Sequence, residues 1–302
     1  MNAIYAEELS KSYGGKIAVD NINLVVPEGS IYGFIGRNGA GKTTTQKMVC
    51  GLARPSSGNV SLFGNPIGKQ DVREQVGVLI EQPALYPELS AYENLVLQGL
   101  NIGIENPKDQ AHNSLEMVDL TESADKKSKQ LSLGMRQRLG VAVAMMGSPK
   151  LLVLDEPING LDPQGIIEMR GVFEKLNQEM GITIFISSHI LGELSRIATH
   201  YGIINDGRLI QQISAVELAA RSRDYLLVKA SDNNKACRMI QEKFSQSECS
   251  VHDDGIHVFG VKNSGEVNWF LWNNGIVVDE IYLHQQDLEE YFLRLMGGSQ
   301  YA

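Results

Sequence analysis

The chain has 302 residues, of which 43% are hydrophobic and 21% charged, and its net charge is −9. This length suggests two domains or one large domain with an appendage, and the composition excludes disordered, collagenous and disulfide-scaffold proteins. The negative charge argues against a protein that mainly binds nucleic-acid phosphates. No apolar run approaches the roughly 18 to 20 residues of a membrane-spanning helix, and the first nine residues lack the pattern of a secretion signal. Three widely spaced cysteines favour a reducing cytoplasm over a disulfide framework or a zinc site.

Strands and helices alternate from about residue 4 to residue 212, which is typical of an α/β sheet with a parallel core. The expected buried strands are Ser30–Ile35, Leu151–Leu154 and Ile182–Ile186, and antiparallel strands are expected beside them at Lys16–Val26 and Gly58–Phe63. The expected helices are Lys42–Cys50, Tyr92–Leu100, Pro107–Val118, Gly134–Met146, Pro163–Met180 and Ile190–Ala198. No strand is evident between about residues 88 and 148, which predicts a helical insertion.

The composition changes after Ser214, so we expect one domain over residues 1–214 and a small α+β accessory domain over residues 215–302. Its expected elements are helix Val216–Ser222, strand Tyr225–Ala230, helix Asn234–Phe244, a hairpin at Cys249–Phe259 turning at Asp254-Gly255, helix Glu266–Trp272, strand Ile276–Tyr282 and helix Leu288–Met296. Trp269 and Trp272 lie three residues apart on one of these helices and are expected in the core. Cys237 and Cys249 have no metal-ligand companions, and no catalytic pattern is visible in this domain.

A glycine-rich loop follows the first apolar strand. The segment Gly36-Arg37-Asn38-Gly39-Ala40-Gly41-Lys42-Thr43 fits the pattern G-x-x-x-x-G-K-[ST] and precedes a helix-forming run that includes Thr44. The glycines let backbone N–H groups turn toward phosphate oxygens, and the helix N-terminus adds positive potential. Lys42 is expected to reach the β and γ phosphates of a nucleotide and Thr43 to ligate Mg²⁺.

Two adjacent carboxylates end another apolar strand. In Leu151–Pro157 four apolar residues precede Asp155 and Glu156, and ligands of α/β sheets bind at such strand ends. Asp155 is expected to hold Mg²⁺ and Glu156 to act as the base that polarises the attacking water. Taken alone, the motif is equally consistent with a strand that ends in a solvated acidic turn.

Between these two motifs lies Leu131–Leu139, with the sequence LSLGMRQRL. It resembles the LSGGQ signature of the ATP-binding subunits of ABC transporters, with Leu133 in place of a glycine and Met135 in place of the glutamine. Ser132 and Gly134 retain a hydroxyl and an N–H group at a helix start, where an anion is stabilised. The resemblance implies that this site faces the γ-phosphate bound by a second subunit, so that two chains meet head to tail. Out of context, such a sequence is more often an ordinary helix start.

The resemblance covers residues 4–212 and implies a P-loop NTPase core of the ABC ATPase type, with an antiparallel β subdomain and a helical insertion. It implies three more site residues. Tyr13 resembles the aromatic residue that stacks on adenine, and His189 resembles the switch histidine that contacts the γ-phosphate. Asp162, in the segment NGLDP, resembles the D-loop aspartate that crosses the dimer interface; it also fits an N-cap before Pro163, and both roles are compatible.

The segment Glu81–Pro87, EQPALYP, is similar to the Q-loop of this family. Aligning the Ala-Leu-Tyr-Pro run puts Glu81, not Gln82, at the glutamine position, where a charged carboxylate would contact Mg²⁺ and the water. An alternative register places Gln82 there and shifts the run by one residue. Glu81, the altered signature and the tail Leu288–Phe292 together resemble the bacitracin-resistance and lantibiotic-immunity branch, whose members are peptide exporters.

The resemblance implies an ATPase that binds ATP and Mg²⁺ and energises export through a separate integral membrane permease at the cytoplasmic face of the membrane, with no nucleic-acid partner. A homodimer is favoured over a heterodimer because both halves of the composite site are present. A soluble ABC-type ATPase acting on ribosomes or DNA would be expected to carry two ATPase halves or a long coiled-coil insertion. A GTPase would carry Asn-Lys-x-Asp, but the single Asn-Lys, at Asn234, is followed by Ala236-Cys237. The cargo and the direction of transport stay open.

Overall fold

The computed structural model describes residues 1–189, 191–221, 224–245 and 247–284. The chain divides into two compact units, Met1–Ala215 and Val216–Ala302, each described by itself below. The expected boundary at residue 214 lies one residue before this division. The expected helix Leu288–Met296, and with it the tail segment used for the branch resemblance, lies outside the described residues.

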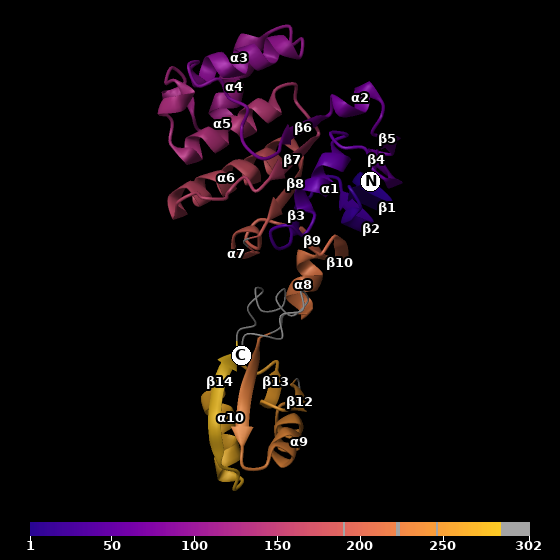
Figure 1. Ribbon diagram of the computed structural model, residues 1–302. Helices are drawn as coiled ribbons and strands as arrows, with labels where there is room; N and C mark the ends of the chain where they lie inside the picture. Colours follow the sequence, from indigo (N-terminus) through magenta and orange to yellow (C-terminus); the bar gives the residue numbers. More distant parts are fainter. Residues whose placement is uncertain (190, 222–223, 246, 285–302) are drawn as a thin grey trace. The chain divides into compact units, whose positions relative to one another are not determined.

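The first unit is built on a six-stranded sheet with the order β10-β9-β3-β8-β7-β6 (Figure 1). Its strands are β3 (Ile31–Ile35), β6 (Val76–Leu79), β7 (Leu151–Asp155), β8 (Thr183–Ser188), β9 (His200–Asn205) and β10 (Arg208–Ser214). All neighbours pair in parallel except β9 and β10. Strands β3, β7 and β8 are buried along their whole length, which is why they read as continuous apolar runs. The predicted parallel core is confirmed.

A four-stranded antiparallel sheet, β2-β1-β4-β5, lies beside this core. Its strands are β1 (Asn2–Tyr13), β2 (Lys16–Pro27), β4 (Ser57–Leu62) and β5 (Asn65–Pro66). Helix α1 (Lys42–Val49) packs between the two sheets, and its Met48 and Val49 share one buried cluster with Leu24 of β2 and Phe185 of β8. Burial on both sides fixes the start of α1 relative to the strand ends of both sheets.

The segment between β6 and β7 is helical, as predicted: no strand occurs among residues 88–148, all of which the structure describes. It contains α3 (Ala91–Asn101), α4 (Pro107–Met117), α5 (Leu133–Met145) and the short 3₁₀ turns Thr121–Ser123 and Ser128–Gln130. Helix α3 begins at a capping box formed by Ser90 and Glu93. Helix α6 (Pro163–Met180) packs against α5, and Figure 1 shows α3 to α6 stacked beside the parallel sheet.

Two short helices complete the first unit, α2 (Gln70–Arg73) and α7 (Leu191–Leu194). Helix α7 is shorter than the expected Ile190–Ala198, so that prediction is wrong in its C-terminal half. Ser195 Oγ donates to the carbonyl of Gly192 at 3.0 Å, and the Tyr201 hydroxyl donates to the carbonyl of Ala198 at 3.2 Å. Beyond Leu194 the backbone bonds are irregular, since the N–H groups of Ile197 and Ala198 both donate to the carbonyl of Leu194, at 3.1 and 2.8 Å. Within the described residues, no helix combines the length and the apolar character needed to cross a bilayer.

Helix α8 (Ala215–Arg221) starts at the last residue of the first unit, and the second unit contains an antiparallel sheet of order β12-β13-β11-β14. Its strands are β11 (Tyr225–Ala230), β12 (Glu248–His252), β13 (Gly255–Phe259) and β14 (Val278–His284). Helices α9 (Asn233–Lys243) and α10 (Ser264–Asn273) bury Ala236, Ile240, Val267 and Leu271 in one core with strand residues such as Val228. The order β-α-β-β-α-β matches the predicted α+β unit. The hairpin turns at Asp253-Asp254, one residue earlier than predicted, because His252 pairs with Gly255.

The prediction that Trp269 and Trp272 lie in the core is wrong, since the two side chains are 70% and 66% exposed. Helix α10 buries Val267 and Leu271, with Phe270 packed against the same cluster. At 3.6 residues per turn, positions 269 and 272 then fall on the opposite side of the helix. Helical spacing alone does not select the buried face, because Val267, Phe270 and Leu271 form a second apolar set on the same helix.

Candidate functional site

The glycine-rich loop of residues 36–41 joins β3 to α1. Gly41 is the N-cap of α1 with φ 106°, and a Cβ atom there would lie 2.6 Å from the carbonyl oxygen of Ala18. Gly39 also has a positive φ of 82°, and Ala40 N–H donates to the carbonyl of Arg37 at 3.1 Å. Residues with side chains are strained in such conformations, so the loop needs its glycines to curl ahead of the helix, where backbone N–H groups favour anions.

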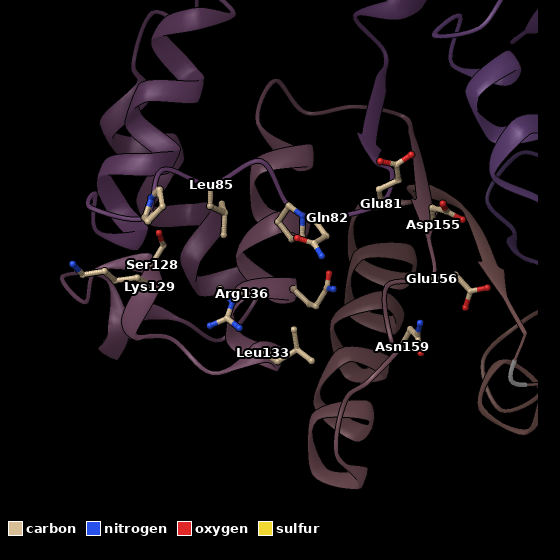
Figure 2. Close-up of a pocket in the computed structure, with 13 residues that line it drawn as sticks. Glu81, Gln82, Leu85, Ser128, Lys129, Leu133, Arg136, Asp155, Glu156 and Asn159 are labelled. Atoms are coloured by element: carbon tan, nitrogen blue, oxygen red, sulfur yellow. The ribbon is translucent and has the colours of Figure 1, made fainter. Parts of the chain in front are cut away.

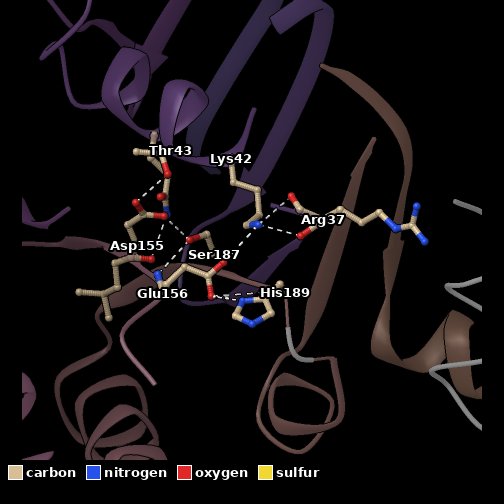
Figure 3. A network of polar contacts seen from close by, with 10 residues as sticks. Arg37, Lys42, Thr43, Asp155, Glu156, Ser187 and His189 are labelled. Atoms are coloured by element: carbon tan, nitrogen blue, oxygen red, sulfur yellow. Dashed lines mark hydrogen bonds and ion pairs between the residues drawn. The ribbon is translucent and has the colours of Figure 1, made fainter. Parts of the chain in front are cut away.

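Lys42, at the first position of α1, is 5% exposed and extends back along the loop (Figure 3). Its Nζ atom donates to the carbonyl oxygens of Gly36 at 2.7 Å and Arg37 at 3.2 Å. The same nitrogen lies 3.2 Å from Oε1 of Glu156. A buried ammonium group is thus held at the centre of the loop, next to a carboxylate from the end of β7.

Asp155 ends β7 and uses its two carboxylate oxygens separately. Oδ2 accepts a hydrogen bond from the Thr43 hydroxyl at 2.8 Å, and Oδ1 accepts one from the Ser187 hydroxyl at 2.6 Å. Thr43 and Asp155 come from segments 112 residues apart, and both were expected at a Mg²⁺ site. The fold therefore brings these two sequence-predicted residues into direct contact.

Glu156 follows Asp155 and adopts φ 48°, a left-handed conformation that is uncommon for a residue with a side chain. Its Oε2 lies 2.8 Å from Nδ1 of His189, which follows β8, and its N–H donates to the Ser187 hydroxyl at 3.0 Å. Such backbone strain clusters at functional sites. Lys42, Glu156 and His189, predicted from three separate motifs, are thus side by side.

The oxygen atoms at this edge of the sheet fit a hydrated magnesium ion. Mg²⁺ prefers oxygen ligands and keeps several waters, and the Thr43 hydroxyl and the Asp155 carboxylate are the oxygen donors that face each other here. Among the described residues, the buried Oε1 of Glu156 has no hydrogen-bond partner and is met only by the charge of Lys42. A buried carboxylate oxygen without a hydrogen bond is costly, so this atom is suited to accept one from a bound water.

Glu81 lies just after β6 and also has a positive φ, 67°. Its Oε1 pairs at 2.7 Å with Nζ of Lys47 on α1. Lys47 holds the pKa of Glu81 below its ordinary value, so the carboxylate is charged at neutral pH and loses the pair only as the pH falls through that lowered value. Glu81 and Gln82 both line the cavity described next. Glu81 thus contacts, through Lys47, the helix that starts at Lys42; its place at the glutamine position stays a prediction.

A cavity of about 810 Å³ lies between the segment that follows β6, the start of α5 and the end of β7 (Figure 2). Its walls include carboxylates from the strand end and cations from the helical insertion. The lining residues are Glu81, Gln82, Pro83, Leu85, Pro87, Ser128, Lys129, Leu133, Arg136, Gln137, Asp155, Glu156 and Asn159. The cavity therefore connects the carboxylates at the end of β7 with the surface of the insertion.

Tyr13 ends β1, is 50% exposed, and has Nζ of Lys11 4.8 Å from its ring centroid. A cation over one face of an aromatic ring is a favourable contact. The exposure of the ring leaves room for the predicted adenine stacking.

Ser132 and Asp162 lie at helix N-termini, and their bonds in the described structure are local. Ser132 is the N-cap of α5 and accepts from the N–H of Met135 at 3.2 Å. Asp162 is the N-cap of α6 and accepts from the N–H of Gly165 at 3.0 Å, with Pro163 at the first helical position. Ser132 and Asp162 are exposed and Gly134 is partly exposed. The predicted N-cap role of Asp162 is confirmed.

Three residues of this region were not predicted from the sequence. Ser187 bridges Asp155 and Glu156, Lys47 pairs with Glu81, and Gln46 Nε2 donates to the carbonyl of Leu154 at 2.9 Å. Each contact joins segments more than 30 residues apart. The sequence offers little signal for these contacts. Ser187 is a polar residue in an apolar strand, whereas Gln46 and Lys47 lie in a helix that is mostly polar and do not stand out from it.

The chain is similar to known transport proteins over nearly its whole length. The sequence model of the ABC transporter family matches residues 19–159. The bacitracin transport ATP-binding protein BcrA of Bacillus licheniformis is 43% identical over 299 residues, covering 98% of this chain and 97% of that protein. The lantibiotic transport ATP-binding protein SrtF of Streptococcus pyogenes is 43% identical over 204 residues, covering 68% of this chain and 87% of that protein.

Solved structures of ATP-binding cassettes match the fold. The cbiO1 protein of Clostridium perfringens, part of the ABC transporter complex cbiONQ, gives a TM-score of 0.67 at 25% identity and covers 81% of this chain and 96% of that one. The dimeric cassette MJ0796, bound to ADP and Pi, gives 0.64 at 25% identity and covers 70% and 98%. With the loop, the strand-end carboxylates and the helical insertion in their expected places, the chain belongs to the ATP-binding subunits of ABC transporters and has the ATPase cassette fold.

Proposed function

We propose that this subunit hydrolyses ATP to energise the export of a peptide antibiotic, a lantibiotic or a drug through a separate membrane permease. The contact of Lys42 with Glu156, beside the pair Thr43 and Asp155, is the observation that carries the hydrolytic part of this proposal. Similarity to a bacitracin transport protein over 98% of the chain and to a lantibiotic transport protein supports the class of cargo. The subunit acts at the cytoplasmic face of the membrane, held there by the permease.

In this proposal Lys42 and the amides of residues 36–41 bind the phosphates of ATP, and Tyr13 stacks on the adenine. Thr43 and Asp155 hold Mg²⁺, which neutralises phosphate charge when bound. Glu156 accepts a proton from the attacking water, since its carboxylate is largely buried, lies 3.2 Å from Nζ of Lys42 and lies 2.8 Å from Nδ1 of His189. His189 positions this carboxylate through Nδ1 and contacts the γ-phosphate, and Glu81 senses the same phosphate from the segment after β6.

The composite site requires two subunits, which we infer to be identical. Ser132 and Gly134 at the start of α5 and Asp162 at the start of α6 carry donors or charge on the surface of the chain. They contribute to the site of the partner subunit, in head-to-tail fashion, as the dimeric cassette to which this chain is similar supports. One chain carries both halves, so a homodimer closes two equivalent sites.

The permease docks, in this proposal, on the segment after Glu81 and on the helical insertion. The cavity of about 810 Å³ runs between these two surfaces and includes Glu81 and Glu156 in its walls. A permease segment bound there would contact Glu81 and would move when Glu81 moves. This contact would couple hydrolysis to transport.

The function is tested by expressing the subunit with the membrane protein encoded beside it in a susceptible bacterium. We expect the pair to raise resistance to bacitracin or to a lantibiotic, and the pair with Glu156→Gln to lose this gain. Resistance unchanged by an active, membrane-bound pair across both compound classes would argue against the proposed cargo. A neighbouring gene that encodes no polytopic membrane protein would favour an ABC-type ATPase that is not coupled to transport.

Asp162→Ala is expected to lower the free energy of unfolding by about 1 kcal/mol, because α6 loses its N-cap. Asp162→Asn retains the acceptor oxygen and is expected to unfold like the wild type in urea. If Asp162 also crosses the dimer interface, both variants will form less ATP-dependent dimer on size exclusion. A normal amount of dimer in Asp162→Asn would show that the negative charge of Asp162 does not contribute to the dimer interface.

Glu81→Gln is expected to change the ATPase rate of the isolated subunit only modestly, because size and one oxygen ligand are kept. Glu81→Ala removes the oxygens that face Lys47 and should impair cellular resistance more than ATP affinity. We would measure nucleotide affinity, ATPase rate and resistance for both variants, with Gln82→Ala as the register control. Loss of resistance in Gln82→Ala, with Glu81→Ala silent, would place the glutamine position at Gln82.

A further inference from the structure

Ser187 lies in the strand β8 and is fully buried. In the parallel pairing of β7 with β8 it stands directly beside Asp155. The preceding residues of the strand, Ile184 to Ile186, are apolar and buried. A hydroxyl group in the interior of such a strand needs hydrogen-bond partners, because water is excluded from it.

Its partners are the two adjacent acidic residues at the end of β7 (Figure 3). The Ser187 hydroxyl lies 2.6 Å from Oδ1 of Asp155 and 3.0 Å from the backbone nitrogen of Glu156. An ionised carboxylate only accepts and a backbone N–H only donates. The hydroxyl therefore donates its proton to Asp155 and accepts the N–H of Glu156, which fixes the direction of both bonds.

Each bond constrains a different part of the site. The bond to Oδ1 holds the Asp155 carboxylate in the plane that leaves Oδ2 facing Thr43 at 2.8 Å. The bond from the Glu156 N–H stabilises the backbone where this residue adopts φ 48°. That conformation directs the Glu156 side chain toward Lys42 and His189. One hydroxyl thus links the orientation of Asp155 with that of Glu156.

We propose that Ser187 is a positioning residue for ATP hydrolysis, which holds the Mg²⁺-side carboxylate of Asp155 and the base Glu156 in register. The proposal rests on the proposed roles of those two residues. An apolar residue at this position would leave the buried Oδ1 of Asp155 and the partly buried N–H of Glu156 without this partner. Ser187 acts only through Asp155 and Glu156 and need not touch the nucleotide.

Two variants separate this role from a contribution to stability. Ser187→Ala removes the hydroxyl, and Ser187→Thr restores it. The control is Thr183→Val at the other end of β8, where Thr183 Oγ1 accepts the N–H of Gly29 at 2.9 Å. Thr183 lies on the same strand as Ser187, and its buried hydroxyl also accepts a backbone N–H. The control therefore removes a comparable hydroxyl that is away from the carboxylates. Circular dichroism and thermal unfolding verify that all three variants fold.

The first measurement is the affinity for Mn²⁺. Bound Mn²⁺ is detected by electron paramagnetic resonance at a saturating concentration of a non-hydrolysable ATP analogue. We expect Ser187→Ala to weaken Mn²⁺ binding on the order of tenfold, the size of effect for a lost hydrogen bond to a charged group. The affinity for the analogue in EDTA should change less than about twofold, because the phosphate loop is untouched. Ser187→Thr and Thr183→Val should both bind Mn²⁺ like the wild type.

The second measurement is steady-state ATP hydrolysis. Ser187→Ala should lower kcat by about ten- to a hundredfold with little change in KM, since the loss affects the orientation of the base. Wild-type Mn²⁺ affinity and kcat in Ser187→Ala, or an equal loss in Thr183→Val, would overturn the positioning role. Wild-type protein that binds ATP but hydrolyses none of it would instead refute the proposed function, and the positioning role with it.

Discussion

Glu156→Gln is expected to bind ATP and to hydrolyse it about 10² to 10⁴ times more slowly than the wild type, the range for loss of a general base. Glutamine has the same shape and keeps an oxygen toward His189, whose Nδ1 lies 2.8 Å from Oε2 of Glu156. It has no negative charge with which to take a proton from water. ATP should then persist between two subunits, and a dimer that forms only with ATP should appear on size exclusion.

The matched control for this variant is Glu179→Gln, an exposed glutamate on α6. It makes the same chemical change away from the site and should leave turnover unchanged. If Glu156→Gln hydrolyses ATP at the wild-type rate, Glu156 is not the base. If turnover falls but no ATP-dependent dimer appears, the result supports Glu156 as the base and contradicts the head-to-tail dimer.

The motifs at strand ends could be predicted because each depends on a short continuous segment. Lys42 and Thr43 come after β3, Asp155 ends β7 with Glu156 next in the chain, and His189 follows β8. The carboxyl ends of parallel strands meet at one edge of a sheet, so a sequence that shows these strands also predicts that their terminal residues meet. The contacts of Lys42 and His189 with Glu156 agree with that reasoning.

The bridging role of Ser187 could not be predicted, because it depends on which strands are neighbours and in what register. Asp155 and Ser187 are 32 residues apart and meet only since β7 and β8 pair in parallel with these two residues opposite. A one-residue shift would turn Ser187 to the other face of the sheet. Strand β6 was also missed, since its residues Val76–Leu79 are few and lie beside polar segments.

In the accessory unit, the sequence does not show which face of a helix is buried. The order of elements in this unit was predicted, but the face of α10 was assigned to Trp269 and Trp272 on size and spacing alone. The buried face of α10 is the one that packs against the sheet, and it carries Val267 and Leu271. Amphipathic spacing identifies a helix more securely than it identifies which of two apolar stripes is buried.

Lys42→Ala is expected to weaken ATP binding itself, by about 10- to 150-fold, because charged hydrogen bonds to the phosphates contribute about 1.5 to 3 kcal/mol. The Lys42 ammonium also bonds the carbonyls of Gly36 and Arg37 and faces Glu156. Its loss leaves a buried carboxylate without its cation, so the variant should also unfold at a lower temperature. Affinity for a fluorescent ATP analogue and the melting temperature are measured on the same sample.

Adding Glu156→Gln to Lys42→Ala separates the two effects. The double variant lacks the unpaired buried charge and should recover much of the thermal stability, yet it should still bind ATP as weakly as Lys42→Ala, since no cation reaches the phosphates. Lys108→Ala, an exposed lysine on α4, is the control for surface charge and should bind normally. Near-wild-type affinity in Lys42→Ala would refute the assignment of residues 36–43 to phosphate binding. Recovered affinity in the double variant would mean that repulsion from Glu156, and not the missing ammonium, weakens ATP binding in Lys42→Ala.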